Sequence, residues 1–176
     1  MATVTIFGGS HVKEGEPDYE KARELGRALA KAGHAVCNGG YGGIMEASAR
    51  GAKEAGGLTM GVTTEDFGGP ANMWIGEEIR MKKWTKRLFK LVELGDAYVV
   101  FDGGTGTLAE LFVVWEMSNK AFIQKPIVLF GAELQKLVSQ IKQWPPVTGS
   151  ARSSRLVFAS TVEEALGALK KKEKNR

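Results

Sequence analysis

The sequence has few of the features that mark secreted or membrane proteins. Its 176 residues include a single cysteine, Cys37, so no internal disulfide can form, and a reducing compartment suits such a chain. No apolar run approaches the length that spans a membrane. The apolar stretch 2–7 is too short for the core of a signal peptide. We therefore expect a soluble, cytoplasmic protein without a membrane partner.

Metal ligands and nucleic-acid motifs are also scarce. His11 and His34 are isolated, and neither has metal-ligand spacing with Cys37, so we expect no metal and no cofactor. Much of the net charge of +4 comes from the last residues of the chain. We interpret 171–176 as a basic, disordered tail that follows a domain of residues 1–170. Because aromatic residues do not alternate with basic ones, nucleic acid is not an expected partner.

Glycine, by contrast, is abundant. The chain has 23 glycines, and they gather directly after short apolar runs. Three clusters, at 8–10, 38–43 and 102–107, carry the clearest pattern. Glycine at such places lets the chain turn tightly or lets bare backbone approach a ligand.

Short apolar runs alternate with helical patterns along the chain. The pattern predicts strands at 3–7, 34–37, 58–62, 78–81, 97–101, 127–130 and 156–159, and helices at 18–32, 44–55, 84–94, 107–119, 132–144 and 161–170. Such alternation is typical of right-handed βαβ units. We therefore predict a single-domain α/β protein with a Rossmann-like, doubly wound parallel sheet.

The three glycine clusters follow predicted strands. Ligands of open parallel sheets bind beyond the carboxyl ends of the strands, so the clusters are expected to converge on one crevice. At 102–107 a strand leads into a helix that begins at about Thr107. Its free N–H groups, with the hydroxyls of Thr105 and Thr107, suit a phosphate. The spacing matches neither the dinucleotide fingerprint nor the Walker pattern.

Two charged residues stand on apolar helix faces. Glu110 lies in an apolar sector, where a carboxylate costs on the order of several kcal/mol unless a positive group or a ligand meets it. Its alternative role is to close a capping box with Thr107. Arg87 is either a snorkelling or ion-paired structural residue, or an inward guanidinium directed at phosphate. Together, Arg87 and Glu110 indicate a site for an anionic, hydrolysable ligand.

The glycine motifs resemble those of the LOG family, cytokinin-activating nucleoside 5′-monophosphate phosphoribohydrolases once labelled lysine decarboxylases. Residues 103–110 (GGTGTLAE) resemble the family's PGGxGTxxE motif, and 38–45 (NGGYGGIM) its GGGxxGLM turn. Residues 8–10 are similar to its first glycine-serine loop, and Arg87 falls on the arginine of its MxxRK motif. The resemblance covers about residues 3 to 130.

The resemblance implies hydrolysis of the N-glycosidic bond of a purine nucleoside 5′-monophosphate, of the cytokinin type or AMP. The products would be the free base and ribose 5-phosphate. Arg87 and Glu110 would be the catalytic residues. The phosphate and nucleotide would be bound by Gly9, Ser10, Gly39, Gly40, Gly43, Met45, Gly103, Gly104, Thr105, Gly106 and Thr107.

The sequence departs from the family pattern at three positions. Asp102 replaces a proline, Leu88 a lysine and Trp84 a methionine. An acidic group near the phosphate and a lost positive charge favour the alternative function, a non-catalytic nucleotide- or molybdenum-cofactor carrier with similar glycine motifs. A pyridoxal-phosphate lysine decarboxylase is disfavoured, because neither Lys120 nor Lys125 is marked as a Schiff-base lysine. Both lysines are expected to be solvated.

The helix Thr107–Asn119 is apolar on nearly all sides. Such a helix is either covered by the rest of the fold or shared across an interface. Resemblance to the LOG family favours the second arrangement, a homodimer formed through this helix.

Overall fold

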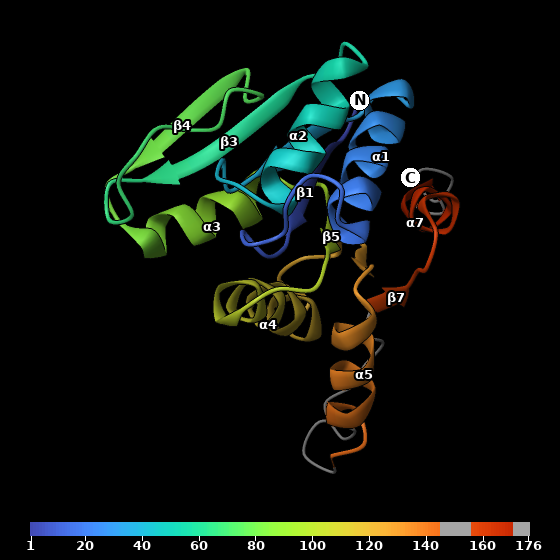
Figure 1. Ribbon diagram of the computed structural model, residues 1–176. Coiled ribbons are helices and arrows are strands. Elements are labelled where there is room, and N and C mark those ends of the chain that lie inside the picture. Colours follow the sequence, from blue (N-terminus) through green and yellow to red (C-terminus); the bar gives the residue numbers. More distant parts are fainter. Residues whose placement is uncertain (145–155, 171–176) are drawn as a thin grey trace.

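A seven-stranded, wholly parallel sheet forms the centre of the computed structural model, which describes residues 1–144 and 156–170 (Figure 1). The strands are β1 (Thr3–Phe7), β2 (Ala35–Asn38), β3 (Thr59–Thr64), β4 (Glu77–Met81), β5 (Ala97–Val100), β6 (Ile127–Leu129) and β7 (Leu156–Phe158). The described helices are α1 (Pro17–Lys31), α2 (Ile44–Glu54), α3 (Trp84–Leu94), α4 (Thr105–Asn119), α5 (Ala132–Ile141) and α7 (Val162–Lys170). The predicted Rossmann-like α/β fold is confirmed.

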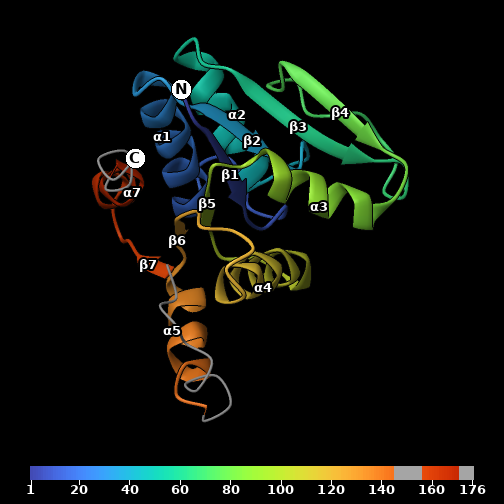
Figure 2. The same cartoon turned by 180° about the vertical axis from the view of Figure 1, so that it is seen from behind.

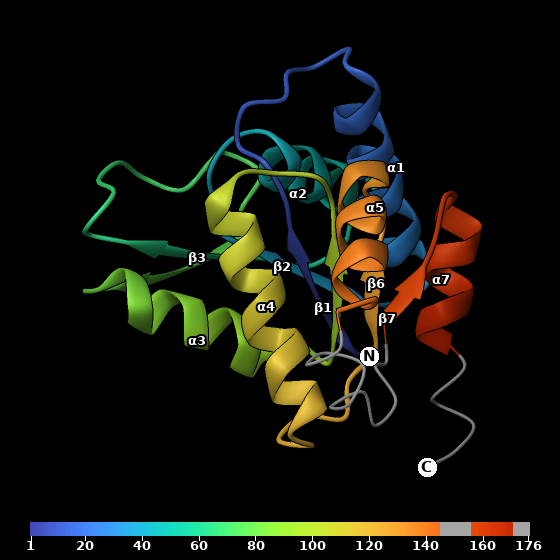
Figure 3. The same ribbon diagram turned by 90° about the horizontal axis from the view of Figure 1, so that it is seen from below.

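Helices cover both faces of the sheet (Figures 1 and 2). On one face, α1, α2 and α7 pack against strand residues such as Val4 and Ile6. On the other face, α3, α4 and α5 pack against Phe7 and Tyr98. Because successive side chains of a strand point to opposite faces, the central strands contribute to both layers. The views in Figures 1 and 3 agree that α3 and α4 lie side by side.

The direction of winding reverses between β1 and β5. The strand order is β4-β3-β2-β1-β5-β6-β7, so the chain first moves outward from β1 to β4 and then returns through α3 to the far side of β1. Phe7 pairs with Val100, which brings the carboxyl ends of β1 and β5 together. This is the switch point at which open α/β sheets bind ligands. Two of the three glycine turns follow these two strands directly.

Element boundaries differ from the predictions in a few places. Helix α4 begins at Thr105, with Gly104 at its N-cap, rather than at about Thr107. Helix α5 ends at Ile141 rather than at residue 144. Strand β3 continues to Thr64 rather than ending at residue 62, and the loop 65–76 joins the parallel neighbours β3 and β4 without a helix. The predicted tail 171–176 lies outside the described residues.

Several sequence-based expectations concern chemistry away from the glycine turns. No helix within residues 1–144 and 156–170 combines the length and apolar character needed to cross a membrane. In the same residues no three potential metal ligands of the His, Cys, Asp or Glu type gather at one place. Cys37 is buried on β2, and burial raises the pKa of its thiol to about 12, so the thiolate form is rare at neutral pH.

Candidate active site

Backbone hydrogen bonds join the three glycine turns into one surface. The N–H of Gly9 donates to the carbonyl of Asp102 (3.0 Å), and the N–H of Ile44 donates to the carbonyl of Gly9 (2.9 Å). Gly43 has a φ of 66° and, like Gly103, approaches Gly9 so closely that a Cβ would collide with it. The first turn therefore lies between the other two, and all three meet at the switch point.

The first turn of α4 is open to solvent. Gly104, Thr105 and Gly106 are exposed, and a Cβ on either glycine would meet no other atom within 4 Å. Thr107 is buried, and its side chain contacts Gly103. Thr107 therefore supports the turn, while the open amides and the helix dipole form a surface that favours an anion.

Arg87 on α3 is buried beside the second glycine turn, with its side chain only 5% exposed. Its Nε donates to the carbonyl of Val62 (2.7 Å), and its Nη2 donates to the carbonyl of Gly39 (3.2 Å). These two bonds fix the plane of the guanidinium. A Cβ at position 39 would collide with Nη2, so glycine is required there. Because the guanidinium does not reach solvent, the snorkelling interpretation of Arg87 is wrong.

Glu110 on α4 faces Arg87. Its Oε1 lies 3.6 Å from Nη1 of Arg87, and its side chain is 13% exposed. This separation is longer than a hydrogen bond. Burial raises the pKa of Glu110 to about 7, although the charge of Arg87 opposes the shift. Burial also lowers the pKa of Arg87, but an arginine remains charged at neutral pH. The pair thus joins a fixed positive charge to a carboxyl that titrates near pH 7.

The capping-box interpretation of Glu110 is wrong. Helix α4 begins two residues before Thr107, and no side chain forms a cap hydrogen bond at its start. The TxxE pattern therefore does not mark the N-terminus of this helix. What remains is an inward carboxylate opposite Arg87.

The second glycine turn is supported by Asn38, which is not among the predicted site residues. Its Nδ2 donates to the carbonyl of Met45 (2.8 Å), and its Oδ1 accepts the N–H of Gly40 (2.8 Å). Met45 is buried with Asn38, whereas Ser10 of the first turn is exposed. The sequence signal for this role of Asn38 was a polar residue between a buried strand and two glycines.

The carboxylate of Asp102 is hydrogen-bonded to the start of α5. Its Oδ1 accepts the N–H of Leu134 (2.8 Å), and its Oδ2 accepts the N–H of Glu133 (3.2 Å). The carboxylate is therefore matched by the positive end of α5. Leu88 is buried. The sequence pattern predicts an acidic group near the bound phosphate at position 102, and the carboxylate there is already bonded to two backbone N–H groups of α5.

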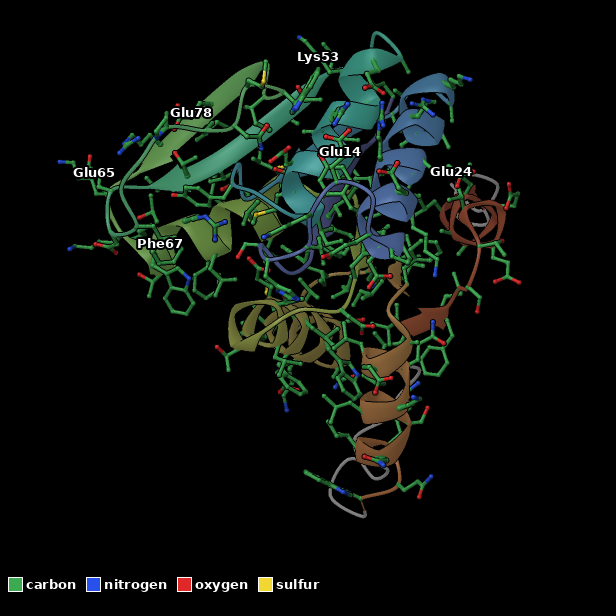
Figure 4. The ribbon with its side chains drawn as sticks, in the orientation of Figure 1. Glu14, Glu24, Lys53, Glu65, Phe67 and Glu78 are labelled. Atoms are coloured by element: carbon green, nitrogen blue, oxygen red, sulfur yellow. The ribbon has the colours of Figure 1, made fainter. Side chains whose placement is uncertain are left out.

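Two aromatic rings lie over Arg87. Its Cζ is 5.5 Å from the ring centre of Tyr41 and 5.7 Å from that of Phe67. Tyr41 belongs to the second glycine turn, and Phe67 belongs to the loop 65–76. Figure 4 shows Phe67 beside α3, whereas Glu65 lies at the outer edge of the molecule. Neither ring was predicted as part of the site, because only the contact with Arg87 reveals them.

The two lysines weighed for a decarboxylase lie elsewhere. Lys120 is exposed and forms an ion pair with Glu116 (3.6 Å). Lys125 is half-buried, and its Nζ contacts the carbonyls of Val92 and Glu93 (both 3.4 Å) at the end of α3. Lys125 is therefore partly exposed, with its Nζ near the last carbonyls of α3.

Fold and glycine turns together define a Rossmann-like α/β protein of the LOG type. Residues 1–166 match the model of the SLOG cluster4 family. A cytokinin riboside 5′-monophosphate phosphoribohydrolase of Rhodococcoides fascians is 30% identical over 96% of this chain and 89% of its own length. The chain belongs to the SLOG cluster4 family, and the prediction of a LOG family member is confirmed.

Two further comparisons concern relatives with different described roles. A pyrimidine/purine nucleotide 5′-monophosphate nucleosidase of Escherichia coli K12 is 29% identical over 73% of this chain, a match that spans 30% of its own length. The molybdenum cofactor binding protein of the phototrophic bacterium Rippkaea orientalis is similar in structure, with a TM-score of 0.76 and 25% identity. That match covers 97% of this chain and 96% of the other.

Proposed function

We propose that the protein hydrolyses the N-glycosidic bond of a purine nucleoside 5′-monophosphate, of the cytokinin type or AMP. The products are the free base and ribose 5-phosphate. The observation that carries this proposal is the buried pair of Arg87 and Glu110 beside the open first turn of α4. The names of the relatives from R. fascians and E. coli support chemistry on nucleoside monophosphates.

The 5′-phosphate is assigned to the start of α4. There the exposed segment Gly104–Gly106 offers free N–H groups and the hydroxyl of Thr105. Gly103 and the buried Thr107 pack against each other and support this turn. Gly9 and Ser10 flank the start of α4, because the N–H of Gly9 in the glycine turn 8–10 is bonded to the carbonyl of Asp102. The remaining predicted residues, Gly39, Gly40, Gly43 and Met45, shape the second wall of the nucleotide site.

The chemical step places positive charge on the ribose. Water adds to C1′ while the bond from C1′ to the base nitrogen breaks, and the departing base takes up a proton. The transition state resembles an oxocarbenium ion. Ionised Glu110 stabilises that charge or positions the water, and Arg87 orients the phosphate or the sugar. A preorganised charge of this kind contributes about 3 kcal/mol to lowering a barrier.

Incubation with AMP tests this function. We expect the wild-type protein to release adenine and ribose 5-phosphate in equal amounts. The Glu110→Gln variant keeps the shape of the side chain but not its charge, and it should lower kcat by about a hundredfold or more. Both products are quantified by chromatography. AMP that binds to the wild type without being cleaved would contradict the hydrolase.

The second candidate function is a carrier that binds a nucleotide or molybdenum cofactor without cleaving it. Its support is the structural similarity to the R. orientalis protein. The departure at Asp102 no longer favours it, because that carboxylate caps α5. The AMP experiment separates the two functions, since the carrier binds its ligand and releases it unchanged.

We also propose that the protein works in the cytoplasm as a homodimer formed through α4. Leu111 and Val114 are buried on one face of this helix, but Phe112 on another face is 40% exposed. Val113 and Met117 are only half-buried. An apolar helix face of this kind is suited to a second copy of the chain.

A further inference from the structure

Phe67 is an exposed aromatic residue at the edge of the candidate site. Its side chain is 58% exposed, and its ring centre lies 5.9 Å from that of Tyr41. Isolated exposed apolar residues are common on protein surfaces. Phe67 differs from them because it also lies over the guanidinium of Arg87, which faces Glu110.

The chain just before Phe67 is tied to two neighbours. The carboxylate of Asp66 accepts the N–H of Trp84 (2.7 Å) at the start of α3. The hydroxyl of Tyr41 accepts the N–H of Thr64 (3.0 Å) at the end of β3. The preceding residues therefore hold Phe67 between α3 and the second glycine turn.

The chain after Phe67 is tied down as well. The N–H of Asn72 donates to the carbonyl of Gly40 (2.7 Å), and its Nδ2 donates to the carbonyl of Tyr41 (2.8 Å). The loop is thus fixed at both ends to the parts of the chain that surround Arg87. An aromatic face presented in this way offers a preformed surface to a flat ligand.

We propose that Phe67, with Tyr41 beside it, is the stacking surface for the base of the nucleotide. This inference rests on the proposed nucleotide site and assigns the part of it that selects the substrate. The phosphate lies at the start of α4 and the sugar beside Glu110, which leaves the loop side of Arg87 for the base. A phenyl ring has no hydrogen-bonding group, so it binds a base through stacking and apolar contact. Purines, with two fused rings, are favoured over pyrimidines.

Two substitutions separate stacking from simple bulk. Phe67→Leu keeps an apolar side chain but removes the aromatic face, whereas Phe67→Trp keeps a stacking surface. Both are placed in the Glu110→Gln background, so that AMP is not consumed during titration calorimetry. Loss of base stacking weakens binding by about tenfold to a hundredfold. We expect this loss for AMP with Phe67→Leu and near-original binding with Phe67→Trp.

Ribose 5-phosphate is the matched control ligand, because it has the sugar and the phosphate but no base. Its binding should be unchanged by either Phe67→Leu or Phe67→Trp. Equal weakening of AMP and ribose 5-phosphate binding by Phe67→Leu would show that Phe67 only holds Arg87 in place, and would overturn the proposal. Unchanged AMP binding by Phe67→Leu would overturn it too. If the wild type binds AMP without cleaving it, only the proposed hydrolysis is refuted. The comparison of AMP binding with ribose 5-phosphate binding can still be made.

Discussion

Glu110 occupies a position where its ionised form is costly. Burial raises the pKa of its carboxyl from the usual value of 4.5 to about 7. The folded chain therefore holds this proton more tightly than the unfolded chain. By linkage, the stability contributed by protonated Glu110 is fully present below pH 4.5 and is lost as the pH rises through about 7.

This titration gives a prediction that does not depend on any substrate. Between about pH 5 and pH 8 the free energy of unfolding of the wild type should fall by roughly 2 kcal/mol relative to Glu110→Gln, which cannot titrate. Urea denaturation of both chains at the two pH values measures the difference. Parallel pH dependence in the two chains would mean that Glu110 is not a buried, titrating carboxyl.

Single residues were predictable where local periodicity reveals them. Arg87 and Glu110 each stand on the apolar side of a helix, and a helical period suffices to detect such an anomaly. Asp102 and Phe67 gain their roles from contacts with distant parts of the chain. Asp102, for example, bonds to Leu134 across 32 positions, and no local pattern foretells that contact.

Helix α4 links the site to the proposed dimer. Phe112→Glu would place a charge on the exposed apolar face and should convert the dimer into monomers. Leu58→Glu is the matched control, because Leu58 is also exposed but lies just before β3. Light scattering coupled to gel filtration gives the mass of each chain in solution. A wild type with the mass of one chain would refute the dimer.

Strands and helices could be predicted because glycine and short apolar runs punctuate the sequence. The start of α4 could not be predicted in this way. The residues TxxE at 107–110 have the form of a capping box, but the helix begins at Thr105 and no side chain caps it. The loop 65–76 has no periodicity. Its place between β3 and β4 follows from strand pairing, which is a property of the sheet.

The winding order of the sheet brings the parts of the site together. The reversal between β1 and β5 places two glycine turns side by side, and α3 returns across the sheet to bring Arg87 opposite Glu110. This convergence could be predicted from the alternation of strands and helices, because parallel strands share one carboxyl edge. Distances and partners within the site required the packed structure.

We propose that Arg87, opposite Glu110 and beside the start of α4, binds the nucleoside 5′-monophosphate. Titration of AMP into Arg87→Met tests it most directly, with Arg27→Met as control, since Arg27 pairs with Glu54 on the α1–α2 side. We expect Arg87→Met to weaken AMP binding about a hundredfold and Arg27→Met to leave it unchanged. AMP binding of wild-type strength by a folded Arg87→Met chain would show that Arg87 does not bind the nucleotide.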